Sequence, residues 1–257
     1  MIFPLRKPNY DEKFPHLNKA PIVEAVIDLR INSTVSWNDK ILKEQIKSRL
    51  PNYTKIEENH EIEFKVTVGS PQDSTNKDLG CVGIRAISND GFYIAQFNKV
   101  GFTLSRVKQY EDWKTFCDET NKLWSLYREL LAPKAIKRIG VRFINRMLAD
   151  YKSKEFLTCF RDAPKAKQIF SWGIENFLHK DVLRVPNTNY HVNLIKTIVS
   201  SPTKQNEVAA ILDCDVFYGE EASCEWSDIG NHLRAIHWIK NKVFFESIAK
   251  KKIKEYK

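Results

Sequence analysis

Apolar and polar residues alternate with a period of two along residues 135–147, AIKRIGVRFINRM, and this pattern predicts a β-strand at the centre of the chain. Alternate side chains of a strand point to opposite faces of its sheet. The apolar face of this strand holds Ile139, Val141 and Phe143. The opposite face carries three guanidinium groups, those of Arg138, Arg142 and Arg146, with Gly140 between the first two.

The same patterns predict elements on both sides of the central strand. Period-two alternation predicts earlier strands at 22–31, 61–69, 80–87, 91–99 and 101–108. Helical spacing predicts a helix between Ser36 and Pro51 and a longer one at 112–131, and the polar stretch 70–79 predicts a loop. The later elements are expected to be helices at 153–160, 164–179 and 227–249, a short strand at 182–185, and strong strands at 190–200 and 207–219. In the last helix, the spacing leaves open whether Ile239 or Lys240 faces inward.

The order of these elements is similar in residues 20–147 and 151–250. It predicts a single α+β domain, 1–257, made of two similar halves, each an antiparallel sheet with a long helix packed on it, as in helix-grip or TATA-binding-protein-like folds. No repeat is visible residue by residue, so the duplication is inferred from element order alone. A helix on one face of a sheet leaves the other face open, and the three arginines are expected there.

Composition and charge narrow the class of protein. The chain has 257 residues, of which 42% are hydrophobic, and this is enough for a substantial core without disulfides. A total of 41 Lys and Arg against 32 Asp and Glu gives a net charge of +9, which favours a polyanionic partner such as nucleic acid. Part of the excess lies in a basic C-terminal tail, where five lysines fall within residues 250–257.

Several common kinds of site have no motif in this chain. The five cysteines include no Cys-x-x-Cys pair, so neither a disulfide framework nor a zinc site is predicted, and no bound metal or cofactor is expected. No P-loop, Gly-x-Ser-x-Gly or Gly-x-Gly-x-x-Gly motif is present, which disfavours nucleotide hydrolases and dinucleotide-dependent enzymes. No stretch is typical of a signal peptide or long enough to cross a membrane, so a cytoplasmic protein is expected.

Four segments together resemble an uncharacterised, sporadically distributed prokaryotic protein family. They are LNKAPIVEAVIDLRI near the start, FTLSRVKQYEDW in the middle, IKRIGVRFINRM at the centre, and ILDCDVFYG followed by HLRAIHWIKNKVFFESI near the end. The resemblance spans nearly the whole chain, and RIGVRFIN is its most specific part. It implies no catalytic motif. Patchy occurrence is typical of mobile-element and phage-defence proteins, so the resemblance implies that context.

The arginine-bearing face is the first candidate site. Guanidinium groups recognise phosphates and carboxylates through paired hydrogen bonds. Arg85 and Arg106, on the strands before the long helix, are expected to extend this patch of Arg138, Arg142 and Arg146. The alternative is that the arginines pair with acidic residues of adjacent strands, which include Glu24, Asp28, Glu61 and Glu63.

Asp213 and Asp215 are the second candidate site. They are two residues apart on one predicted strand and therefore share a face, an arrangement that can hold a divalent cation for phosphodiester hydrolysis. His191, on another predicted strand, would be the acid–base residue. No third ligand stands at motif spacing, so the alternative is that both carboxylates neutralise arginines in the folded protein.

These observations predict a non-enzymatic binding or assembly component of a phage-defence or mobile-element system. Its arginine-bearing sheet face would hold nucleic acid or an acidic protein partner. The chain is expected to act in a multi-protein assembly or an oligomer, without a membrane. The alternative function is a metal-dependent nuclease that uses Asp213 and Asp215.

Overall fold

The computed structural model describes residues 8–32, 37–65, 75–108, 110–150, 155–162, 174–200 and 207–257. The strands within these ranges are β1 (Ile22–Ile31), β2 (Lys55–Lys65), β3 (Thr75–Ile87), β4 (Tyr93–Asn98), β5 (Gly101–Val107), β6 (Ile136–Asp150), β7 (Leu178–Arg184), β8 (Tyr190–Ser200) and β9 (Glu207–Tyr218). The helices are α1 (Asp39–Arg49), α2 (Trp113–Leu131), α3 (Trp226–Ser247) and α4 (Lys250–Lys254), with a short 3-10 turn, η1 (Glu155–Thr158).

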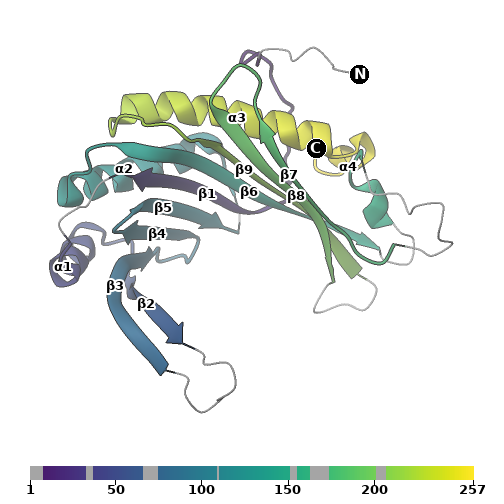
Figure 1. Ribbon diagram of the computed structural model, residues 1–257. Coiled ribbons are helices and arrows are strands. Elements are labelled where there is room, and N and C mark those ends of the chain that lie inside the picture. Colours follow the sequence, from purple (N-terminus) through teal and green to yellow (C-terminus); the bar gives the residue numbers. More distant parts are fainter. Residues whose placement is uncertain are drawn as a thin grey trace.

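The nine strands form one curved antiparallel sheet in the order β2-β3-β4-β5-β1-β6-β9-β8-β7 (Figure 1). The expectation of two similar halves, each with its own sheet and long helix, is therefore wrong. The physical reason is the position of β6 at the end of the first predicted half: it pairs with β1, where Ile27 lies opposite Val141, and it also pairs with β9 of the second predicted half. On their other edges β1 pairs with β5, and β6 pairs with β9 from Ile139 to Asp150. Hydrogen bonding therefore runs from β2 to β7 without a break.

Most predicted strands are confirmed with shifted ends, but three segments that were not predicted as strands belong to strands. β2 begins at Lys55 rather than at residue 61, and residues 75–79 belong to β3 rather than to a loop. Leu178 and His179, predicted as helix, belong to β7 because they pair with β8, and this pairing overrides local helical spacing. The predictions at Ser36, 66–74, 153–154 and 164–173 lie outside the described residues.

The two long helices expected at 112–131 and 227–249 are confirmed, and their apolar stripes form the core with one face of the sheet. Asp112 starts α2, because its carboxylate accepts a hydrogen bond from the backbone N–H of Thr115 (2.8 Å). Trp124 and Tyr127 of α2 are fully buried. Of the helices in the described ranges, none combines the length and apolar character needed to cross a membrane.

The other face of the sheet is open among the described residues. On β6, the odd-numbered residues from Ile139 to Ala149 are all buried beneath the helices, and the even-numbered residues point away from them. Figure 1 shows α2 and α3 along the same side of the sheet. The predicted division of β6 into an apolar face and an arginine-bearing face is therefore confirmed. Arg138, Arg142 and Arg146 all belong to the open face.

Candidate binding surface on the open face of the sheet

Arg138 lies at the centre of the open face, between carboxylates from the two neighbouring strands. Its Nη1 donates to Asp28 of β1, and its Nη2 donates to both oxygens of Asp215 of β9 (2.7 and 2.9 Å). Gly140 leaves the room for this side chain, because a Cβ there would lie 2.3 Å from Arg138 Nη1. The guanidinium carbon also lies 4.7 Å from the centre of the Phe217 ring. The glycine at position 140 of β6 thus makes space for the side chain of Arg138.

The two carboxylates around Arg138 have further donors. Asp28 accepts from the Thr103 hydroxyl (3.1 Å) and from Arg30 Nε (3.0 Å). Asp215 accepts from Asn193 Nδ2 at 3.0 Å. Donors from β5, β1, β6 and β8 therefore converge on these two side chains. Since all of these donors except Arg30 come from a neighbouring strand, this network stabilises strand register.

Arg142 forms the second ion pair of the open face, with Asp213 of β9. Its Nε donates to Oδ1 (2.8 Å) and its Nη2 to Oδ2 (2.5 Å), a bidentate geometry. This hydrogen-bonded contact, opposed by desolvation, raises the pKa of Arg142. The arginine side chain is 48% exposed, whereas that of Asp213 is 12% exposed. Arg142 is therefore paired and still accessible from solvent.

Arg146, the third arginine of β6, lies opposite Ile211 of β9 and is half-buried. No carboxylate of the described residues lies within ion-pair distance of it. The three arginines predicted as one stripe thus differ in their surroundings: two have counter-ions on neighbouring strands, and Arg146 has none within the part of the chain that the structure describes. This difference follows from their partners on β9, because Asp213 and Asp215 reach only the first two.

Arg106 does not extend this patch, and that part of the prediction is wrong, whereas Arg85 shares the open face at a distance from the β6 arginines. Arg85 lies on β3, separated from β1 by two strands, and donates to Glu57 of β2 (3.2 Å). Arg106 points to the helix-covered face, is 3% exposed, and donates to Glu111 (3.0 Å). Its guanidinium lies 4.4 Å from the centre of the Tyr93 ring.

Asp213 and Asp215 lie near arginines, as the internal-pairing alternative predicted, rather than facing an open space. A divalent cation at either carboxylate would have to displace a guanidinium, and the remaining arginine charge would oppose it. His191 shares the open face and stacks on Phe217 (5.3 Å between ring centres). Among the described residues, no hydrogen bond or ion pair joins His191 to either aspartate, and its buried Nδ1 has no hydrogen-bond partner. The geometry therefore gives no support to the nuclease alternative.

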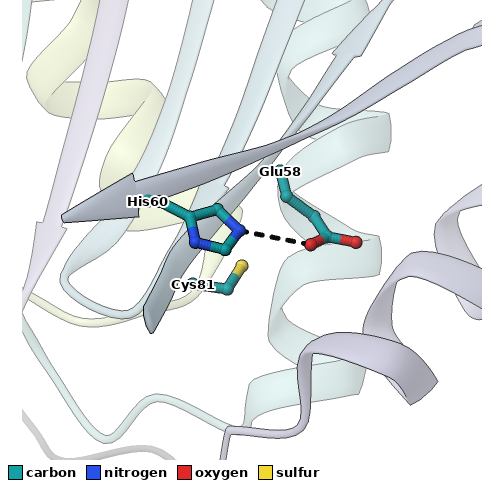
Figure 2. A group of neighbouring side chains, drawn as sticks. All are labelled: Glu58, His60 and Cys81. Atoms are coloured by element: carbon teal, nitrogen blue, oxygen red, sulfur yellow. Dashed lines mark hydrogen bonds and ion pairs between the residues drawn. The ribbon is translucent and has the colours of Figure 1, made fainter. Parts of the chain in front are cut away.

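Glu58, His60 and Cys81 form a separate cluster on the β2–β3 ribbon, with one ligand-type atom of each within 4.8 Å of the others (Figure 2). The imidazole lies between two carboxylates: Nδ1 is 2.8 Å from Asp78, and Nε2 is 3.3 Å from Glu58. Glu58 also accepts from the Lys43 ammonium (2.6 Å). Hydrogen bonds to Asp78 and then to Glu58 raise the pKa of His60. These contacts favour a bound proton over a metal ion.

Exposed aliphatic side chains share the open face with the arginines, and no pattern in the sequence marked them as a possible site. They lie towards the β7 edge and are Leu148, Leu178, Val182 and Val199. Val182 is 67% exposed and Leu178 is 73% exposed. Strict alternation within β8 and β9 indicated which residues share a face, but the exposure of that face depends on what covers it. This mixed region, from β6 to β7, is hereafter the open-face patch.

Comparison of the chain with protein-family models, curated proteins and solved structures gave no match. The resemblance to a sporadically distributed prokaryotic family therefore stays a prediction, as does a place in phage defence or on mobile elements. The geometry of the residues in the open-face patch is therefore the observation that bears on binding.

Proposed function

We propose that this chain is a non-enzymatic binding component that holds an acidic protein partner on its open-face patch. The observation that carries the proposal is the mixture of exposed aliphatic side chains with cations that have no internal counter-ion. The cations are Arg146 of β6 and Lys180 of β7, and neither forms an ion pair within the described residues. The aliphatic side chains beside them are those of Leu148, Leu178, Val182 and Val199.

Charge complementarity selects the chemistry of the partner. Asp213 and Asp215 are already neutralised by Arg142 and Arg138, so they do not cancel the charge of Arg146. At Arg146 and Lys180 the patch therefore offers positive charge, which Asp or Glu side chains of a partner would meet, whereas Asp150 and Glu207 at its end have interactions of their own. Burial of the aliphatic residues would supply the non-directional part of the binding energy.

A protein suits this surface better than a nucleic acid does. Nucleic-acid binding depends mainly on lysines and arginines that neutralise phosphates, and two of the three β6 arginines are already paired internally. Bases stack on aromatic rings, whereas the exposed apolar side chains of the patch are aliphatic. Exposed apolar surface beside an arginine instead suits a protein interface, because interfaces bury apolar surface at their core and are enriched in arginine.

The test places a photo-crosslinking amino acid at Val199, within the open-face patch, in the full chain expressed in its native host. A crosslinked protein is expected from this position. In the Arg146→Glu background its yield should fall at least fivefold, since the substitution places like charge opposite an acidic partner. Mass spectrometry of the crosslinked band identifies the partner and its acidic segment.

The matched control carries the crosslinker at Arg234, an exposed position of α3 on the opposite side of the sheet. Equal crosslinking of the same proteins from both positions would show non-specific contact. A product from Val199 that nuclease treatment removes would replace the protein partner with nucleic acid. Undiminished crosslinking in the Arg146→Glu background would contradict the proposed role of charge.

A further inference from the structure

A cavity of about 360 Å³ lies on the helix-covered side of the molecule, between the N-terminal arm, the start of α2 and the last turns of α3. Aromatic side chains form much of its wall: Phe14, Tyr110, Trp113, Phe244 and Phe245. Its size falls in the range of small-molecule sites, which combine apolar walls with a few polar groups. Its polar groups include Lys240 of α3 and Asn145 of β6.

Lys240 is the unusual group of this cavity. The side chain is 8% exposed, and its ammonium lies 4.0 Å from the centre of the Phe143 ring. No carboxylate of the described residues lies within ion-pair distance of it. Buried lysines are ordinarily paired, because desolvation of an ammonium is costly. An aromatic face offsets only part of this cost.

The two carboxylates in the cavity wall are engaged elsewhere. Asp112 caps α2 by accepting hydrogen bonds from Thr115, at its backbone N–H (2.8 Å) and its hydroxyl (2.7 Å). Glu111 accepts from Arg106 at 3.0 Å. Neither carboxylate is therefore the counter-ion of Lys240, and the cavity keeps one uncompensated positive charge.

His237 and Asn145 are neutral polar groups of the wall. His237 stacks on Trp113 with ring centres 4.4 Å apart, and burial together with the charge of Lys240 lowers the pKa of His237 to about 3. Asn145 is 3% exposed and donates from Nδ2 to the backbone carbonyl of Leu212 (3.2 Å). Beside Lys240, a ligand therefore meets these two neutral groups, and His16, Asn18 and Asn241 also line the cavity.

We propose that this cavity binds a small organic monocarboxylate with an aromatic body, and that Lys240 neutralises its carboxylate. One ammonium balances one negative charge, so a phosphate dianion would remain half compensated. The aromatic walls favour a ring-bearing ligand, because rings pack edge to face or offset against one another. Phe14 stacks on Phe245 (5.4 Å), so the N-terminal arm forms one wall of the site.

The probe is 3-phenylpropanoate, and its neutral match is 3-phenylpropanamide, which has nearly the same shape. Isothermal titration calorimetry of the full chain should show at least tenfold tighter binding of the acid than of the amide. In Lys240→Met, which keeps side-chain length and removes the charge, the acid should bind at least tenfold more weakly and the amide should bind as before. Lys251→Met, an equal charge change at an exposed position of α4, should leave both affinities unchanged.

A second variant tests the location independently of Lys240. Ala20 lines the cavity beside the arm, so Ala20→Trp should fill it and abolish binding of both probes, with the circular dichroism spectrum unchanged. This comparison and the acid–amide comparison on the unmodified chain remain informative if Lys240→Met does not fold. Equal affinity for acid and amide, a preference retained in Lys240→Met, or no binding of the acid to the unmodified chain would overturn the proposal.

Discussion

Two cations lie on opposite faces of β6: Arg138 of β6 itself and Lys240 of α3. They differ in which groups balance their positive charge. On the open face, Arg138 has a side chain that is 19% exposed and hydrogen-bonds to Asp28 and Asp215. On the helix-covered face, Lys240 is 8% exposed and lies over the ring of Phe143, without a carboxylate in reach among the described residues. The first charge is neutralised within the fold, and the second is not.

The difference shows which buried cation is structural and which is available to a ligand. Desolvation of an ion costs several kcal/mol, and well-placed counter-ions offset much of it. Arg138 already has those counter-ions, so a further anion would gain little from it. Lys240 bears the desolvation cost alone, and burial lowers its pKa to about 8. A carboxylate entering the cavity would supply the missing counter-ion.

The largest expected effect comes from removing the balanced cation. Arg138→Met should lower the free energy of unfolding by about 4 kcal/mol, because it leaves Asp28 and Asp215 close together without the guanidinium that joins them. Urea denaturation at pH 7 measures the loss. Arg30→Met is the matched control: Arg30 also donates to Asp28, but its side chain is 56% exposed, so its loss should change stability by less than about 1 kcal/mol. Equal effects of the two substitutions would contradict a structural role for Arg138.

The unbalanced cation should respond in the opposite direction. Lys240→Met should raise the free energy of unfolding at pH 7 by up to about 3 kcal/mol, the equivalent of lowering the pKa of a lysine from 10.5 to about 8. The same urea titration measures the gain. The exposed control Lys251→Met should stay within about 0.5 kcal/mol of the unmodified chain. A loss of stability in Lys240→Met would mean that the ammonium has a counter-ion in solution.

The advantage of Lys240→Met should also depend on pH. Below pH 8 the lysine is charged in both the folded and unfolded states, so its full cost is present. Between pH 8 and 10.5 the folded state releases the proton first, so the unfolded state binds more protons and the unmodified chain gains stability as pH rises. The difference in unfolding free energy between the two proteins should therefore shrink across this window. A constant difference from pH 7 to 10.5 would contradict the lowered pKa.

Local pattern predicted the faces of the strands but not the order of the strands. Alternation on β6 separated Ile139 and Val141 from the arginines, because side-chain direction depends only on adjacent residues. The same rule places Arg106 in phase with Phe102 and Leu104, and this parity shows that it belongs to the core face. The single sheet could not be predicted, because it depends on β6 pairing with both β1 and β9, which lie far from it in the sequence.

The candidate sites were likewise predictable only where they depend on adjacent residues, and not where they depend on pairing or packing of distant segments. The carboxylates that neutralise Arg138 and Arg142 could be proposed from strand parity, but their exact partners required the register of β6 with β9. Helical spacing left open whether Ile239 or Lys240 faces inward, and both are buried. The cavity beside Lys240 could not be predicted, because it is bounded by the N-terminal arm and by two helices from distant parts of the sequence.

The loss of stability expected for Arg142→Ala lies between the losses expected for Arg138→Met and for Arg30→Met. Its side chain is 48% exposed, but its partner Asp213 is only 12% exposed, so Arg142→Ala would leave a mostly buried carboxylate beside open solvent. We expect a loss of about 1–2 kcal/mol, since water reaches part of the pair and weakens it. Thermal and urea denaturation both measure it. A loss as large as that of Arg138→Met would show that exposure does not distinguish these two pairs.

The smallest effect on stability should come from Arg146, although the proposed function gives it the largest effect on binding. Without an ion partner among the described residues, Arg146→Met should change the free energy of unfolding by less than about 0.5 kcal/mol. Its long apolar stem is replaced by a side chain of similar size, so packing beside Ile211 is kept. Capture of the partner identified by crosslinking at Val199 should nevertheless weaken, and the remaining binding should depend less on salt because one charge contact is lost. Loss of stability with unchanged capture would assign Arg146 to the fold, and the open-face patch would then lack the free cation on which the proposed function depends.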